Sequence, residues 1–221
     1  MRTIFALLRL AIAVLSIIAI VSTFLSTAAR TTINPFNFFG YFTMQSNIFT
    51  AVVLLIVGLA GLARRRKSKG LELAHAAATT YIVIVGLVYN TLLAGLPGGV
   101  DDPWANTVLH VVVPLYAAID WLLFGDRGKI PFTRLGLILA YPILWIVVVL
   151  IRGATDGWVP YPFLDPANGY VTVAVYCIAI AAAFAVVGWL VLWYSRIRIL
   201  KPDGRSKTRA RSGHERARSA L

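Results

Sequence analysis

The sequence predicts an all-α, polytopic membrane protein with six transmembrane helices and with both termini in the cytoplasm. The first observation is composition: 59% of the 221 residues are hydrophobic and 14% are charged, whereas a soluble domain has about 25% charged residues. The second is that six apolar runs, each near the roughly 20 residues that cross a bilayer, cover most of the chain. The third is that basic residues gather in alternate loops.

The apolar runs are separated by short polar loops that contain Pro, Gly and charged residues. We expect the first run to be a retained span, because it is longer than the roughly 7–15 apolar residues of a cleaved signal peptide. The expected spans are residues 5–26, 41–62, 72–96, 104–124, 135–151 and 170–194. Residues 1–194 therefore form one transmembrane domain, and residues 195–221 form a basic cytoplasmic tail that we expect to be disordered.

Charge sets the expected orientation. With six spans, all but two of the 21 Lys and Arg residues lie on the side of the N-terminus, the second and fourth loops and the tail, the exceptions being Arg30 and Arg152. Because Lys and Arg favour the cytoplasmic side, we expect a multi-pass protein of the cell membrane. The net charge of +12 follows from the same bias, so we expect membrane lipids, and no nucleic acid, as partners. The basic tail is either a topology signal, which we favour, or a contact for anionic lipid headgroups.

Polar residues inside the spans are the candidates for function. The second span begins with polar residues at i, i+3, i+4 and i+7, which share one helix face and should face protein rather than lipid. They are Thr43, Ser46, Asn47 and Thr50. For this face as a whole, hydrogen bonding between helices is the more common role.

The fourth span carries His110 inside a run otherwise suited to lipid, and an ionisable residue there is a functional candidate by default. Asn106 is four residues away and lies on the same face, and Asn90 lies toward the outer end of the third span. Thr43, Asn90, Asn106 and His110 can therefore meet in one layer near the outer membrane face if the second, third and fourth spans are neighbours.

That layer has the parts of a nucleophilic site. A threonine hydroxyl becomes a nucleophile when an imidazole takes its proton, so Thr43 would attack and His110 would act as base. Asn106 or Asn90 would orient the ring, and Asn47 or Asn90 would stabilise the oxyanion. From the residues alone, His110 could equally be a hydrogen-bonding or proton-carrying residue.

Two further ionisable residues lie nearer the cytoplasmic end, where we expect structural roles. Asp120 lies ten residues beyond His110, about 15 Å deeper along a helix, and we expect it to pair with Arg127 or Lys129. His75 should be an interfacial residue. Asp101 and Asp102, in the outer loop, are weaker site candidates. The single cysteine, Cys177, gives no disulfide and no metal-ligand pattern.

Three segments resemble bacterial six-span relatives of the androgen-induced and androgen-dependent membrane hydrolases. They are YFTMQSNIF at 41–49, NTVLHVVVPLYAAIDWLLF at 106–124 and GWVPYPFLD at 157–165. The resemblance implies cleavage of fatty acid esters of hydroxy fatty acids, with Thr43 as nucleophile, His110 as base and Asp120 at the position of the family's acidic residue. Pro114 follows the histidine by four residues rather than five, and Pro160 is an additional proline, so the match is partial.

The expected function is thus hydrolysis of a lipid ester near the outer membrane face, with no metal or organic cofactor. Trp158, Tyr161 and Phe163 in the last loop would form either a lid over the site or an interfacial anchor. The alternative is a non-enzymatic membrane protein, either a small-solute or proton-linked carrier or a structural partner. The pattern specifies neither the substrate nor the oligomeric state.

Overall fold

The computed structural model describes residues 1–96, 102–197 and 199–200. It is 80% helical, with no β-strand among those residues, and six of its helical segments are long and apolar enough to cross a membrane. The predicted fold class is therefore confirmed. The six segments are Arg2–Ala28, Phe42–Leu62, Lys69–Leu93, Pro103–Leu123, Phe132–Thr155 and Tyr170–Tyr194.

Four spans are essentially single helices and two are composite. The single ones are α1 (Arg2–Ala28), α3 (Phe42–Leu62), α7 (Leu135–Thr155), which the short turn η3 (Phe132–Arg134) precedes, and α8 (Tyr170–Tyr194). The third span joins α4 (Lys69–Val88) to η1 (Tyr89–Leu93), and the fourth joins α5 (Pro103–Thr107), η2 (Val108–Val112) and α6 (Val113–Leu123). The predicted sixth span, 170–194, is reproduced, whereas the fifth extends to Thr155 rather than ending at 151.

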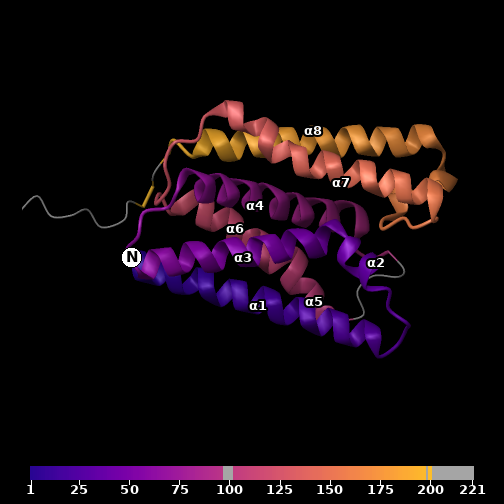
Figure 1. The fold of residues 1–221 in the computed structure, drawn as a ribbon, viewed down its shortest axis with the longest axis horizontal. Helices are drawn as coiled ribbons and strands as arrows, with labels where there is room; N and C mark the ends of the chain where they lie inside the picture. The colour runs from indigo at the N-terminus through magenta and orange to yellow at the C-terminus, as the bar shows by residue number, and fades with distance from the viewer. Residues whose placement is uncertain (97–101, 198, 201–221) are drawn as a thin grey trace, which may run out of the picture.

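The helices lie side by side along the long axis of the molecule (Figure 1). One end, which we call the basic end, holds Met1, the loop 63–68, the loop 124–131 and the end of α8. The other, which we call the aromatic end, holds the loop 29–41 with α2 (Pro35–Gly40) and the loop 156–169. Both ends of the helical domain thus lie at the basic end, as an even number of spans requires. The cytoplasmic location of that end remains a prediction.

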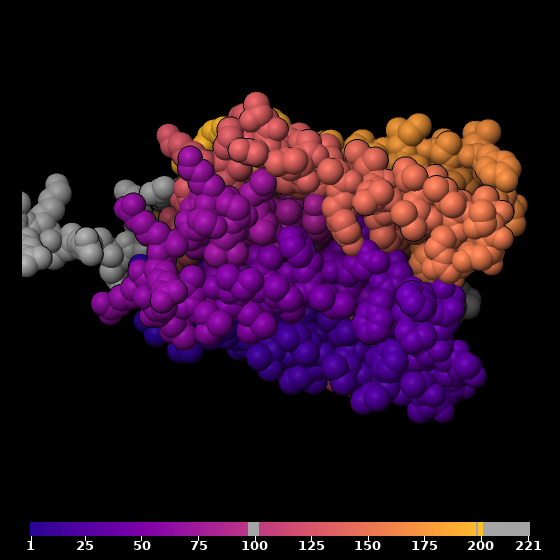
Figure 2. All heavy atoms as spheres, in the orientation of Figure 1, coloured from indigo at the N-terminus to yellow at the C-terminus, as the bar shows by residue number. Residues whose placement is uncertain are grey.

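α1 and α3, in indigo and violet, lie on the opposite side of the molecule from α7 and α8, in salmon and orange (Figure 2). α1 packs along α3, and α4 contacts α3, α6 and α8. Close approach of α1 and α3 depends on Gly58, where a Cβ would lie 3.0 Å from the carbonyl oxygen of Ala6. Small residues at such contacts are the usual means of packing helices in lipid. The outer faces of α7 and α8 expose large apolar side chains, which suits contact with acyl chains.

A buried ionic cluster joins α1, α4 and α6 near the basic end. The Arg9 guanidinium lies 2.9 Å from Asp120 and 2.7 Å from Asp126, and Lys67 lies 2.9 Å from the other oxygen of Asp126. His75 Nε2 lies 3.3 Å from Asp120. Burial alone would raise the pKa of Asp126, but its hydrogen bonds and charge interactions with Arg9 and Lys67 outweigh burial and hold that pKa well below its usual range.

This cluster corrects two predictions. Asp120 pairs with Arg9 rather than with Arg127 or Lys129, because α1 lies beside α6. The Arg9 guanidinium can bond the carboxylates of Asp120 and Asp126 at once. Arg127 instead lies over the Trp121 ring, 4.3 Å from its centroid. His75 is not an interfacial residue: its side chain is buried against the same tryptophan.

The first residues of the predicted tail are packed against the basic end. Ser195 is buried and accepts a hydrogen bond from the Ile130 amide at 3.0 Å. The backbone of Leu200 pairs with that of Leu123 and Gly125. Residues 201–221, on which most of the tail prediction falls, lie outside the described residues.

Candidate functional site

The polar face of α3 turns into the protein, as predicted. The side chains of Thr43, Ser46, Asn47 and Thr50 are all buried. Asn47 Nδ2 donates to the Thr43 carbonyl at 3.0 Å and to the Leu109 carbonyl at 3.3 Å. Both hydrogens of the Asn47 amide are therefore bonded to backbone carbonyls, and Asn47 links α3 to the fourth span. In this arrangement Asn47 has no N–H left to donate to an oxyanion.

Two π-helical segments, η1 and η2, lie at the predicted site. Pro114 has no N–H, so the His110 carbonyl cannot receive the usual helical hydrogen bond from it. Asn90 Nδ2 donates to that carbonyl at 3.1 Å, and to the Gly86 carbonyl at 2.7 Å. Gly86 permits this approach, because a Cβ there would lie 2.7 Å from Pro114 Cβ. Asn90 is thus a structural link between the third and fourth spans, which are neighbours as the prediction required.

His110 is held from two sides. Its Nδ1 lies 3.0 Å from the Asn106 carbonyl, four residues earlier. Since a carbonyl only accepts, Nδ1 carries the proton in the neutral ring and Nε2 keeps a lone pair, which suits a general base. The Tyr89 ring stacks on the imidazole with centroids 3.8 Å apart, and the Asn106 amide donates to the Tyr89 phenol at 2.5 Å. Asn106 therefore orients His110 through its backbone and through Tyr89.

Thr43 is the second residue of α3, in the first turn where backbone N–H groups have no helical partner. Its N–H donates to the Tyr161 phenol oxygen at 3.3 Å, and its hydroxyl lies 3.4 Å from the same oxygen. Burial raises the pKa of Tyr161 to about 12, so the phenol stays protonated at neutral pH and can donate. Tyr161 belongs to the loop 156–169, which we call the aromatic loop, and the Trp158 ring of that loop packs against Gly40.

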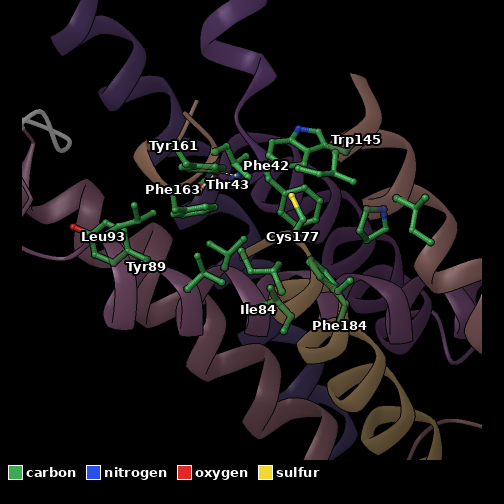
Figure 3. Close-up of a pocket in the computed structure, with 18 of the residues that line it drawn as sticks. Phe42, Thr43, Ile84, Tyr89, Leu93, Trp145, Tyr161, Phe163, Cys177 and Phe184 are labelled. Atoms are coloured by element: carbon green, nitrogen blue, oxygen red, sulfur yellow. Dashed lines mark hydrogen bonds between the residues drawn. The ribbon is translucent and has the colours of Figure 1, made fainter. Parts of the chain in front are cut away.

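An apolar cavity of about 140 Å³ opens beside Thr43, between α3, the third span, α7, α8 and the aromatic loop. Figure 3 shows Thr43 and Tyr161 at one side of it, with Tyr89 and Leu93 from the third span nearby. Its wall is almost entirely hydrocarbon, with rings from Phe42, Trp145 and Phe184. Such a cavity suits an acyl chain.

Among the described residues no hydrogen bond joins the side chains of the predicted Thr43–His110 pair. His110 is not part of the cavity wall, whereas its stacking partner Tyr89 is. Asn47 connects the two segments, since it bonds both Thr43 and Leu109, the neighbour of His110. Thr43 and His110 therefore lie in neighbouring segments that Asn47 links. The Tyr89 ring packs on the His110 imidazole.

Sequence reasoning missed Tyr89 and Tyr161 as site residues. The sequence predicted Tyr161 only as part of a lid over the site or an interfacial anchor, and it did not predict a direct contact with Thr43. Of the weaker candidates, Asp102 accepts a hydrogen bond from Ser22 at 2.6 Å, and Asp101 lies outside the described residues. In the part of the chain that the structure describes, no three His, Cys, Asp or Glu side chains gather closely enough to hold a metal ion.

No protein-family model, curated protein or solved structure matches this chain. The six apolar helices nevertheless identify it as a multi-pass integral membrane protein.

Proposed function

We propose that the chain is a membrane hydrolase that cleaves lipid esters, with Thr43 as nucleophile and His110 as general base. The observation that carries the proposal is Thr43 in the wall of an apolar cavity, at a helix N-terminus and with its hydroxyl within hydrogen-bonding distance of the half-buried Tyr161 phenol. An acyl chain would occupy the cavity and place its ester carbonyl at the polar rim. The three segments that resemble the androgen-induced and androgen-dependent hydrolases support the same assignment.

The chemistry would proceed through an acyl-enzyme. Thr43 Oγ1 attacks the ester carbonyl while His110 Nε2 takes the hydroxyl proton, and the alcohol leaves with that proton. Water then attacks the acyl-threonine and gives one proton to His110, which returns that proton to Thr43 Oγ1 as the fatty acid leaves. The Thr43 N–H and the Tyr161 hydroxyl are the donors we assign to the oxyanion. The Thr43 N–H now donates to the Tyr161 oxygen at 3.3 Å and would turn from it to the oxyanion.

One rearrangement is part of this proposal. Among the described residues His110 makes no hydrogen bond to Thr43, so the imidazole must move toward the threonine, and Tyr89, which stacks on the imidazole and lines the cavity, must move with it. Tyr89 begins the π-helical segment η1, and such segments recur at functional sites where the regular helical ladder is interrupted. An acyl chain that entered the cavity would contact Tyr89 directly and could displace it.

A fluorophosphonate probe tests the nucleophile. The purified protein should be labelled on Thr43, with the adduct located by peptide mass spectrometry, and Thr43→Ala should abolish labelling while Thr43→Ser keeps it. Thr50→Ala is the matched control, since Thr50 is another buried threonine on the same face of α3, two turns deeper. Undiminished labelling of Thr43→Ala would refute the assignment.

A proton-linked carrier is the second candidate, favoured by the buried cluster of Arg9, Asp120, Asp126, Lys67 and His75. Intramembrane ionisable residues often form proton pathways. In proteoliposomes, a carrier should show solute uptake that follows a pH gradient, survives Thr43→Ala and is lost in Asp120→Asn. A hydrolase should instead lose its ester cleavage in Thr43→Ala.

A further inference from the structure

The basic end contains a hollow of about 750 Å³ between the start of α1, the loop 63–68 and the loop 124–131. Six basic and two acidic side chains contribute to its wall. The basic ones are Arg2, Arg64, Arg65, Arg66, Lys67 and Arg127. A concave surface of this charge concentrates anions.

The two acidic residues in the wall already have hydrogen-bond partners within the protein. Asp126 accepts from Arg9 and Lys67, and Glu72 accepts from the Gly128 amide at 2.7 Å. The arginines of the loop 63–68 differ, since Arg64, Arg65 and Arg66 are exposed and make no ion pair with any described residue. Arg64, Arg65 and Arg66 therefore give the hollow three guanidinium groups that have no ion-pair partner among the described residues.

The backbone at Arg64 gives independent support. Arg64 follows the end of α3 with φ of 53°, and it is the one non-glycine residue with positive φ in the described chain. Glycine is the usual residue at such a helix end, because a Cβ is strained in the left-handed region. An arginine at this position strains the backbone and so lowers the stability of the fold. Strain of this kind points to a role for the side chain.

We propose that this hollow binds the phosphate group of an anionic phospholipid. Guanidinium groups match phosphate oxygens in fork geometry. A lipid, rather than a soluble phosphate, fits the position: the inner wall includes Val57 and Gly61 of α3, and Leu59 and Leu62 on the same helix are exposed. A headgroup in the hollow would leave its acyl chains beside this apolar surface. Basic pockets at the ends of membrane helices bind lipid headgroups in this way.

The test is thermal unfolding of the purified full-length protein in neutral detergent during three titrations. Phosphatidylglycerol should raise the melting temperature in a saturable manner, whereas phosphatidylcholine at the same concentration should not. Inorganic phosphate is the third titrant. An equal rise with phosphatidylcholine would overturn an anion site, and an equal rise with inorganic phosphate would overturn the lipid assignment.

Variants locate the site. Replacing Arg64, Arg65 and Arg66 together with Gln should weaken the apparent affinity for phosphatidylglycerol about 100-fold. The matched control removes the same charge from the tail through Arg209→Gln, Arg211→Gln and Arg216→Gln, and it should change the affinity by less than about threefold. A larger loss in the tail variant would overturn the proposal.

Arg64→Gly separates binding from folding. Without lipid its melting temperature should be higher than that of the wild type, because glycine relieves the positive φ. With phosphatidylglycerol its gain in melting temperature should be smaller, because one guanidinium is missing. A full lipid response in this variant would show that Arg64 does not contact the phosphate and would remove the argument from backbone strain.

Discussion

The strongest stability prediction concerns Arg9, the fully buried centre of the ionic cluster. Arg9→Met removes the guanidinium that bonds Asp120 and Asp126 and leaves Asp120 buried beside only His75. Breaking a buried ion pair by removing one partner costs about 3–5 kcal/mol. For a chain of this size that corresponds to a fall in melting temperature of roughly 6–20 °C.

The second half of this prediction is recovery. Arg9→Met combined with Asp120→Leu removes both charges, and replacing a buried pair by apolar groups is often nearly neutral. Because Asp126 keeps Lys67 as a partner, the double variant should regain most of the lost stability. Thermal unfolding of the wild type, the two single variants and the double variant gives the coupling energy directly. Additive losses, or a single variant as stable as the wild type, would refute the paired arrangement.

Three further substitutions test the site itself. Gly86→Ala places a Cβ 2.7 Å from that of Pro114 and should destabilise the protein by about 1–3 kcal/mol in thermal unfolding. Asn90→Leu leaves the His110 carbonyl without its donor, at a cost of about 1–3 kcal/mol; a neutral effect would mean that another group satisfies that carbonyl. Tyr161→Phe removes the phenol and should slow fluorophosphonate labelling about 100-fold while the melting temperature changes little; unchanged labelling would exclude the phenol from the oxyanion site.

The sequence was sufficient for the number of spans and for most of their limits, because hydrocarbon thickness and helical rise leave little freedom. It also predicted that the polar face of α3 is buried, since lipid offers no hydrogen bonds to Thr43, Ser46, Asn47 and Thr50. The length of a span and the direction of its polar face can each be derived from a single helix, without knowledge of its neighbours.

What the sequence did not predict depends on which helices touch. Asp120 has basic residues seven and nine positions later, yet its partner is Arg9, on the first span. Periodicity gives the face of each helix but not the neighbour opposite that face. The contact between Tyr161 and Thr43 is of the same kind, because it joins a loop to a helix 118 residues earlier in the chain.

Pro114 explains why the third and fourth spans meet at the candidate site. Pro114 removes one helical donor from the fourth span, which leaves the His110 carbonyl in need of another. Asn90 supplies it from the third span, and only a residue without a Cβ at position 86 lets the helices come close enough. The same carbonyl that fixes the third span thus belongs to the proposed base. A change to Pro114, Gly86 or Asn90 should therefore alter the position of the imidazole as well as the stability of the bundle.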